Sequence, residues 1–351
     1  MSTIPSAITG DAATRVLIVD DSAVARAALS RFVAADGGFV VAGAVPDAQR
    51  ALDFLSREQV DVILLDLEMP RTSGIEALPQ VIAAGRGARV LVVSSSAAEG
   101  AAVTIRALAL GAADTLVKPG AGAFASRFGE ILLQRLAVLA KPGRPSAVSR
   151  DAAVSLGVSF DAIAIGASTG GIHALASLLR AVPGAVAQPI FVTQHLPPSF
   201  SPFFAEQVAL SGRRPCDVAG DRTLVNRGRI LVAPGTAHLT AQRMASGAVV
   251  TRLSQAPTAT GNLPSVDPMF TSLAEVYGSR LLAIVLSGMG RDGLDGARAV
   301  HAAGGTLVVQ DQASSVVWGM PGAVAAAGLA RAVMTPGAIG AMIAASATVA
   351  A

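Results

Sequence analysis

The chain has 351 residues, of which 52% are hydrophobic and 15% are charged, so it has the length and the apolar content for two packed domains. A net charge of +3, 4% aromatic residues and scattered lysines and arginines argue against a nucleic-acid-binding surface. A single cysteine, Cys216, excludes an intramolecular disulfide, and without a signal-peptide pattern or a membrane-length apolar run we expect a cytoplasmic protein that is not inserted in a membrane.

Short apolar runs alternate with alanine-rich amphipathic stretches in the first part of the chain. The runs are "RVLIV", "FVVAG", "DVILL", "RVLVV" and "DTLVK". This alternation predicts an α/β domain with a parallel sheet covered by helices on both faces. The stretch "FASRFGEILLQRLAVLA" predicts a closing helix, and the Pro-, Ser- and Gly-rich segment after it predicts a linker. We therefore expect a first domain over residues 14–140, a linker over 141–159 and a second domain over 160–345.

Polar side chains follow the predicted strands of the first domain. They are Asp20, Asp21, Asp66, Ser94 and Lys118. The carboxyl ends of parallel strands meet at one edge of a sheet, and three carboxylates there repel one another unless a cation such as Mg²⁺ holds them. A metal, a carboxylate, a lysine and a hydroxyl together suit transfer of a phosphoryl group onto the carboxylate. Each residue alone fits a solvated loop position, and only the ordered set favours this chemistry.

This set resembles the receiver domain of two-component response regulators. The acidic pair, "DLEMP" and "KP" carry the resemblance, which covers about residues 15–140. It implies a flavodoxin-like fold with strand order 2-1-3-4-5 and phosphorylation of Asp66. It also implies contacts to Mg²⁺ from Asp21 and Asp66 directly, from Asp20 through water and from the backbone carbonyl of Glu68, and contacts to the phosphoryl oxygens from Ser94 and Lys118. Receivers usually carry an aromatic residue where this chain has Thr115, a departure that concerns their aromatic rotamer switch and not phosphorylation.

A second α/β pattern begins near residue 161. Its apolar runs are "DAIAIG", "PIFVTQ", "GRILVAP", "LLAIVLSG" and "GTLVVQD". The first run leads into "GASTG", residues 166–170, which fits the G-x-S-x-G elbow that presents a serine on a tight turn from strand to helix. The spacing lacks the G-x-G-x-x-G of a dinucleotide site and the lysine of a Walker loop. From these residues alone, Ser168 is either a nucleophile or a helix cap, and a phosphate-binding loop is the weaker alternative.

A nucleophilic serine needs a base, and the chain has four histidines. His195 follows a strand on the same sheet edge as Ser168, and His238 follows another strand. His173 lies in the first turn after the serine, where we expect it to point away, and His301 lies in a predicted helix. Any one of them fits a structural role, but position ranks His195 first and His238 second.

The third member of such a triad is a carboxylate at a strand end. Asp292 follows "LLAIVLSG" within a glycine-rich turn. Asp267 in "PSVDPMF" is better placed to cap a helix, and Asp311 in "LVVQDQ" is the remaining rival. The sequence therefore predicts Asp292 as the partner of the histidine.

Six stretches of the second half resemble the chemotaxis protein-glutamate methylesterases of the CheB type. They are "AIGASTGG", "TQHLPPSF", "ILVAPG", "PSVDPMF", "SGMGRDG" and "VWGMPGA", over about residues 161–329. The resemblance implies a Rossmann-like α/β domain with Ser168 as nucleophile, His195 as general base and acid, and Asp292 as its orienting carboxylate. It also implies an oxyanion-hole N–H from Met289 and a role for Thr169 in placing the histidine.

The resemblance implies phosphorylation-activated hydrolysis of glutamate methyl esters on chemotaxis receptors, with methanol as product, and deamidation of receptor glutamines. The implied partners are these receptors as substrates and a chemotaxis histidine kinase as phosphodonor. Mg²⁺ in the receiver is the implied cofactor, none is implied for the esterase chemistry, and we expect a monomer. Two alternatives stay open: a triad hydrolase connected to another sensory pathway, and a response regulator whose output domain only binds.

Overall fold

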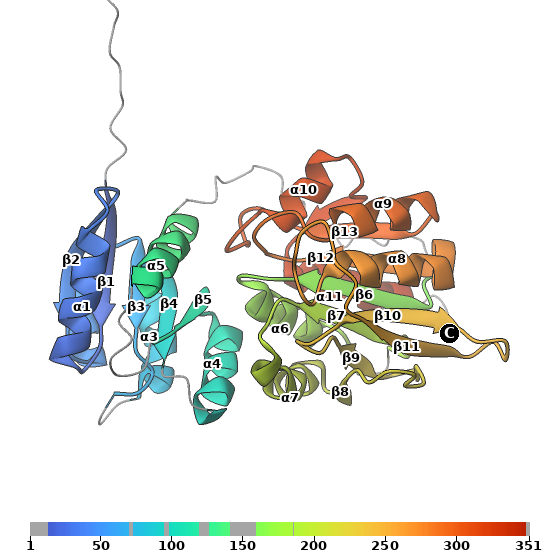
Figure 1. Ribbon diagram of the computed structural model, residues 1–351, viewed down its shortest axis with the longest axis horizontal. Helices are drawn as coiled ribbons and strands as arrows, with labels where there is room; N and C mark the ends of the chain where they lie inside the picture. The colour runs from blue at the N-terminus through green and yellow to red at the C-terminus, as the bar shows by residue number, and fades with distance from the viewer. Residues whose placement is uncertain are drawn as a thin grey trace, which may run out of the picture.

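The computed structural model describes residues 13–69, 73–94, 98–118, 126–140, 159–184 and 186–348. Two parallel sheets, each flanked by helices, lie beside each other along the longest axis of the molecule (Figure 1). Both α/β patterns predicted from the sequence are therefore confirmed. The predicted linker lies outside the described residues except for Ser159, and the domain boundaries remain predictions. No helix in the described ranges has the length and apolar character needed to cross a membrane.

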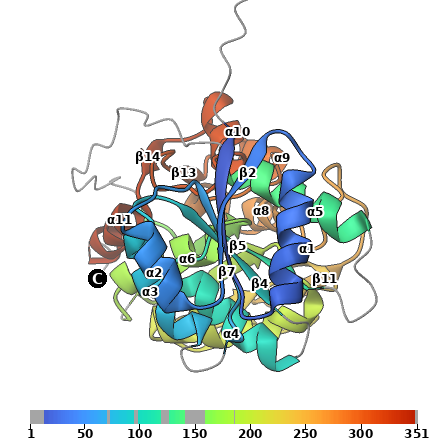
Figure 2. The ribbon, with the colours of Figure 1, turned by 90° about the vertical axis from the view of Figure 1, so that its left-hand side faces the viewer.

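The first sheet has the strand order β2-β1-β3-β4-β5, as the receiver resemblance implies, and every pairing in it is parallel. Its strands are β1 (Thr14–Val19), β2 (Phe39–Val45), β3 (Val62–Leu65), β4 (Arg89–Ser94) and β5 (Asp114–Val117). Its helices are α1 (Ala23–Ala34), α2 (Ala48–Leu55), α3 (Gly74–Ala84), α4 (Ala98–Leu110) and α5 (Ser126–Leu139). In Figure 2, α1 and α5 lie on one side of this sheet and α2 and α3 on the other.

Alternation along β1 explains these two layers. Val16 and Ile18 pack with residues of α1 and α5, whereas Leu17 and Val19 pack with residues of α2, α3 and α4. Successive side chains of a strand point to opposite faces, so a run of apolar residues is what a strand buried on both faces requires. The carboxyl edge of the sheet then carries the polar residues that follow β1, β3 and β5.

The second sheet has seven parallel strands in the order β14-β13-β12-β6-β7-β9-β8. They are β6 (Ala162–Ala167), β7 (Ile190–Gln194), β8 (Cys216–Val218), β9 (Ile230–Val232), β12 (Leu281–Val285), β13 (Thr306–Gln310) and β14 (Ala332–Met334). The strand order reverses beside β6, because the chain adds β7 on one side and β12 on the other. Ligands of open α/β sheets bind at such a switch point, beyond the carboxyl ends of the strands.

Helices cover both faces of the second sheet. One core layer contains residues of α6 (Gly171–Ala181), α7 (Ser201–Gly212) and α11 (Pro336–Thr348), and the other contains residues of α8 (Val266–Tyr277), α9 (Leu294–Ala302) and α10 (Met320–Ala326). Two 3₁₀ turns, η1 (Pro198–Phe200) and η2 (Gly278–Arg280), complete the helical segments. An antiparallel hairpin of β10 (His238–Arg243) and β11 (Val249–Ser254) forms a separate sheet, which the sequence analysis did not predict.

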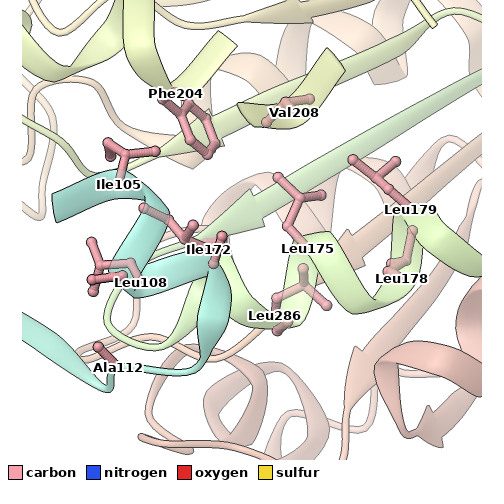
Figure 3. Close-up of a cluster of buried hydrophobic side chains, with 14 of the residues drawn as sticks. Ile105, Leu108, Ala112, Ile172, Leu175, Leu178, Leu179, Phe204, Val208 and Leu286 are labelled. Atoms are coloured by element: carbon pink, nitrogen blue, oxygen red, sulfur yellow. The ribbon is translucent and has the colours of Figure 1, made fainter. Parts of the chain in front are cut away.

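The two α/β units share an apolar interface. Helix α4 of the first unit contacts α6, α7 and η1 of the second. Ile105 and Leu108 of α4 belong to the same buried cluster as Ile172 of α6 and Phe204 of α7 (Figure 3). This packing brings the first unit over the carboxyl edge of the second sheet, where the predicted catalytic residues lie.

Candidate active site

Ser168 occupies the turn between β6 and α6 and is half-buried. Gly170 has φ of 77°, a left-handed conformation that favours glycine, and a Cβ there would meet the side chain of Val316 at 2.5 Å. The Ser168 N–H donates to the carbonyl of Ser287 at 3.0 Å, and the Ser168 carbonyl accepts from Gln194 Nε2 at 2.9 Å. The turn is therefore fixed on both sides, and no side chain larger than hydrogen fits at position 170.

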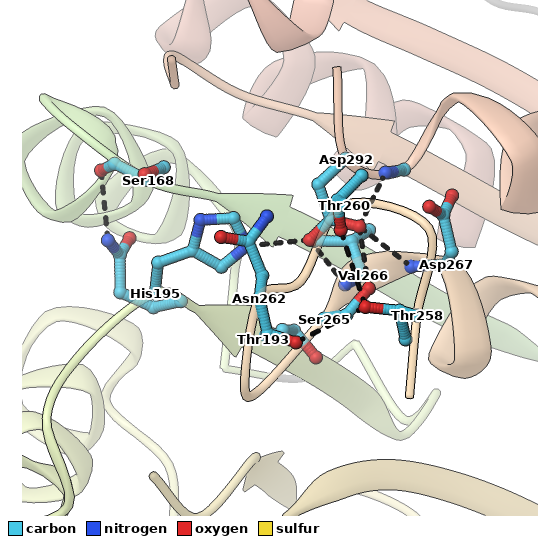
Figure 4. A network of polar contacts seen from close by, with 12 residues as sticks. Ser168, Thr193, His195, Thr258, Thr260, Asn262, Ser265, Val266, Asp267 and Asp292 are labelled. Carbon is cyan, nitrogen blue, oxygen red and sulfur yellow. Dashed lines mark hydrogen bonds and ion pairs between the residues drawn. The ribbon is translucent and has the colours of Figure 1, made fainter. Parts of the chain in front are cut away.

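His195 follows β7 and lies between Ser168 and Asp292 (Figure 4). Its Nε2 is 2.6 Å from Oδ2 of Asp292. A carboxylate only accepts hydrogen bonds, so Nε2 carries the proton and Nδ1 is the nitrogen left for the hydroxyl of Ser168. Ser168 and His195 line the same cavity. The structure thus brings together the three residues that the sequence analysis selected.

Asp292 is fully buried, and the protein surrounds its carboxylate with donors. Besides His195, Oδ2 accepts the N–H of Val266 at 2.9 Å, and Oδ1 accepts the hydroxyl of Ser265 at 2.6 Å. The N–H groups of Gly293 and Asp267 approach Oδ1 at 3.1 and 3.4 Å. Burial favours the neutral acid, but the bonds from His195, Ser265 and Val266 outweigh it and lower the pKa of Asp292 well below its usual range. The carboxylate is therefore ionised and held in one orientation.

The other candidate histidines have different partners. His238 is buried in β10 and bonds the N–H of Ser265 and the carbonyl of Ala256, so it does not act as the base for Ser168. His173 is exposed and lines the same cavity as Ser168, and its Nδ1 lies 3.1 Å from the carbonyl of Ala109 in the first unit. His301 lies in the last turn of α9.

The rival carboxylates are also engaged elsewhere. Asp267 lies in the first turn of α8 and accepts the N–H of Gly296 in α9 at 2.8 Å, so it caps the neighbouring helix and not its own. Asp311 accepts the hydroxyl of Ser314. Neither carboxylate is hydrogen-bonded to a histidine in the part of the chain that the structure describes, which leaves Asp292 as the carboxylate bonded to His195.

Residues of both units line the cavity, which has a volume of about 1250 Å³. Asp114 and Arg135 of the first unit form an ion pair there, and the hydroxyl of Thr169 donates to Oδ2 of Asp114 at 3.3 Å. The resemblance implied a role for Thr169 in placing the histidine, but its hydroxyl is bonded here to the first unit. Met289 is 54% exposed at the same cavity, and no described residue accepts a hydrogen bond from its N–H.

Sequence reasoning missed several of these polar residues. Ser265 stands in "PSVDPMF" and Gln194 directly precedes His195, but neither had a recognisable spacing of its own. Asp114 and Arg135 lie in segments that read only as a strand and a helix. The signals that were available are the adjacency of Gln194 to His195 and the place of Ser265 in the family-like stretch "PSVDPMF".

A second cluster of charges lies at the carboxyl edge of the first sheet. Carboxylate oxygens of Asp20, Asp21 and Asp66 all lie within 4.8 Å of one another. Lys118 Nζ lies 2.8 Å from Asp20 and 2.6 Å from Asp66. Oδ1 of Asp66 accepts the backbone N–H of Glu68 at 3.1 Å. Three carboxylates beside one ammonium leave an excess of negative charge, and an all-oxygen donor set fits Mg²⁺.

The pKa of Asp66 in this cluster is shifted in the opposite direction to the pKa of Asp292. Burial raises the pKa of Asp66 despite the lowering by Lys118 and the Glu68 N–H. Burial also acts to lower the pKa of Lys118, but the carboxylates of Asp20 and Asp66 outweigh it and raise that pKa. Ser94 ends β4, and its side chain lies outside the described part. The hydroxyl of Thr115 has no hydrogen-bond partner among the described residues.

Comparisons with known proteins agree with this architecture. The family model of the CheB methylesterase matches residues 163–343, more than half of the chain, and that of the response regulator receiver domain matches residues 16–123. The chain belongs to the CheB methylesterase family. This family membership and the receiver match confirm both resemblances drawn from the sequence.

Relatives of this CheB-family chain are similar over nearly their whole length. A protein-glutamate methylesterase/protein-glutamine glutaminase 2 of Caulobacter vibrioides is 40% identical over 94% of this chain and 98% of that protein. A protein-glutamate methylesterase/protein-glutamine glutaminase of Maricaulis maris is 37% identical over 94% and 95%. The crystal structure of the Thermotoga maritima CheB methylesterase catalytic domain is 33% identical, with a TM-score of 0.52, over 54% of this chain and 99% of that one.

Proposed function

We propose that this protein hydrolyses methyl esters of glutamate side chains on chemotaxis receptors, with Ser168 as nucleophile, His195 as general base and acid, and Asp292 as the orienting carboxylate. The observation that carries the proposal is the 2.6 Å bond between His195 Nε2 and Asp292 at a cavity that Ser168 also lines. The names of the Caulobacter and Maricaulis relatives supply the substrate class.

The reaction follows from the orientation of His195. Ser168 Oγ attacks the ester carbonyl while Nδ1 of His195 takes the hydroxyl proton, and the imidazolium is stabilised by the ionised Asp292. The Met289 N–H stabilises the oxyanion, a contribution of about 3 kcal/mol per donor. His195 then returns the proton to the methoxide leaving group, and methanol departs. Water, deprotonated by His195, attacks the acyl-enzyme and releases the glutamate and Ser168.

Deamidation of receptor glutamines needs no further residue. The same acyl-enzyme forms when Ser168 attacks a primary amide, and His195 then protonates the departing amide nitrogen, so that ammonia leaves in place of methanol. The word glutaminase in the relatives' names supports this second reaction.

The first unit acts in this proposal as a phosphorylation-dependent control domain. Asp21 and Asp66 would hold Mg²⁺ directly, with Asp20 acting through water and with the Glu68 carbonyl. When bound, Mg²⁺ neutralises charge on the incoming phosphoryl group. Asp66 accepts the phosphoryl group from a chemotaxis histidine kinase, and Lys118 and Ser94 contact its oxygens.

Strand β5 connects the two sites of the proposal. Lys118 directly follows β5 and pairs with Asp66, whereas Asp114 begins β5 and accepts the Thr169 hydroxyl beside the nucleophile. A phosphoryl group adds almost two negative charges at Asp66 and competes for Lys118. A shift of β5 then weakens the contact at Thr169 and opens the cavity to a receptor. We propose a monomer that acts in the cytoplasm.

The test of the triad is methanol release from methylated receptor membranes. We expect Ser168→Ala to abolish release while the fold is retained, because only one hydroxyl is removed. Ser279→Ala, which removes an exposed hydroxyl in η2, serves as the control and keeps wild-type activity. Substantial methanol release by Ser168→Ala contradicts the proposal.

A further inference from the structure

His238 is connected to the hydrogen-bond network of Asp292 through a single residue, Ser265. Ser265, the N-cap residue of α8, is fully buried and donates its hydroxyl to Asp292 Oδ1 at 2.6 Å. The backbone N–H of the same Ser265 donates to Nδ1 of His238 at 2.9 Å. One residue thus donates to Asp292 through its side chain and to His238 through its backbone. Figure 4 shows Ser265 close to Asp292.

The contacts of His238 allow only one protonation state. Nδ1 accepts from an N–H group, so it carries no proton, and Nε2 lies 2.9 Å from the carbonyl of Ala256, so it must donate. The ring is therefore neutral, with its proton on Nε2. The side chain is only 2% exposed, so these two contacts within the protein are the ones that satisfy the ring nitrogens. A neutral ring with one fixed acceptor is suited to holding a single backbone N–H in place.

We propose that His238 is a positioning residue for the triad: its Nδ1 fixes Ser265 so that the Ser265 hydroxyl holds Asp292 in the orientation that His195 needs. This series of hydrogen bonds begins at His238 in β10 and passes through Ser265 at the N-terminus of α8. It continues to Asp292 in the loop after β12 and ends at His195 in the loop after β7. Without the acceptor, the buried Ser265 N–H is left unsatisfied, and residue 265 must move to find another partner. Because the inference depends on the triad assigned under the proposed function, its test needs a readout that does not depend on the substrate.

A purely structural role for His238 predicts a different response of the activity to substitution. The Nε2 bond to Ala256 ties β10 to the segment that follows β11, and this bond alone could account for a buried histidine. The two roles use different ring nitrogens, so two neutral substitutions separate them. In His238→Asn the amide oxygen can occupy the place of Nδ1 and accept from Ser265. In His238→Gln the longer amide reaches the place of Nε2 and keeps the Ala256 bond.

The experiment compares the two variants in the full-length chain. We expect His238→Asn to keep kcat within about threefold of wild type and His238→Gln to lose roughly 10- to 100-fold in kcat with little change in KM, the range that an unsatisfied buried donor produces. The second readout is the rate at which phenylmethylsulfonyl fluoride modifies Ser168, which needs no receptor. The labelling rate should fall in His238→Gln and not in His238→Asn, whatever the natural substrate is.

A double substitution tests the route through Ser265. Ser265→Ala removes the hydroxyl through which His238 acts, so His238→Gln in that background should cost much less than it does alone. Thermal unfolding of each variant separates positioning from stability. Equal losses in His238→Asn and His238→Gln, losses that multiply with Ser265→Ala, or losses that follow the fraction unfolded would each overturn the proposal.

Discussion

The two acidic sites of this chain differ in how far the protein itself matches their negative charge. Asp292 is a single buried carboxylate whose charge is matched by donors from His195, Ser265 and the backbone at the N-terminus of α8. In the receiver, three carboxylates crowd within 4.8 Å of one another, and one ammonium, that of Lys118, serves two of them. The first site is complete within the protein, and we propose that the second takes up a cation from solution.

The pKa directions express the same difference. At Asp292 the donors outweigh burial and the pKa is lowered, so the charge that the proposed mechanism uses to stabilise the imidazolium is present before substrate binds. At Asp66 burial prevails and the pKa is raised, so the charged form becomes more favourable when a cation arrives. A preorganised carboxylate suits catalysis, and a carboxylate that depends on its partners suits a switch.

Among the substitutions that test this comparison, we expect Asp292→Asn to have the largest effect on kcat. It removes the negative charge of the side chain and keeps its shape. We expect a loss of about 10⁴ in kcat, smaller than that of Ser168→Ala, since the amide cannot hold the required tautomer of His195. Methanol release measures it. Asp311→Asn is the control, since Asp311 bonds Ser314 and no histidine. Equal losses in the two variants would mean that Asp292 acts through stability and not through His195.

Asp114→Ala tests the contact by which the receiver reaches the triad. The substitution removes the acceptor of the Thr169 hydroxyl and the partner of Arg135, so we expect basal activity to rise roughly three- to tenfold, as one hydrogen bond allows. Methanol release without phosphodonor measures it. Asp53→Ala removes an exposed carboxylate in α2 and should change nothing. Unchanged basal activity in Asp114→Ala would show that this contact does not restrain the enzyme.

The smallest expected effect is a change in the free energy of unfolding on substitution of Asp267. This change tests the electrostatics around Asp292. Burial and the nearby charge of Asp292 raise the pKa of Asp267 to about 6. The folded state then binds more protons than the unfolded state between about pH 4 and pH 6, so stability falls as pH rises through that range. Asp267→Asn removes this slope, and we expect a gain of roughly 1 to 2 kcal/mol at pH 7 and almost none at pH 4.

Thermal unfolding at the two pH values, compared between wild type and Asp267→Asn, measures that gain. The amide oxygen of the variant can still accept the Gly296 N–H, so the cap on α9 is retained. The same gain at both pH values would show that packing, and not charge, is responsible.

The parts of the fold that the sequence predicted are those with strong local patterns. Strands such as β6 and β12 are continuous apolar runs buried on both faces, and five of the seven strands of the second sheet were predicted in this way. The three-residue edge strands β8 and β14 are too short to form a pattern. The hairpin of β10 and β11 was missed because its alternation of apolar and polar residues is irregular.

The residues of the proposed triad could be selected because each follows a strand, and a parallel sheet brings such positions to one edge. Their supporting residues could not, since the hydrogen bond from Ser265 N–H to His238 Nδ1 joins positions 27 residues apart, a contact that depends on the tertiary fold. The contact of Thr169 with Asp114 depends on how the two units pack, which no local pattern records. Assigning Asp267 as a cap was right in kind, but the helix it caps is 29 residues further along the chain.

Methanol release from methylated receptor membranes, measured with and without a small-molecule phosphodonor and Mg²⁺, tests the central claim most directly. The account predicts that the phosphodonor raises the rate of the wild-type chain and leaves Asp66→Asn at the unstimulated rate, while Ser168→Ala releases no methanol in either condition. A wild-type rate that is the same with and without phosphodonor, or an equal rise in Asp66→Asn, would contradict control of the triad by the receiver.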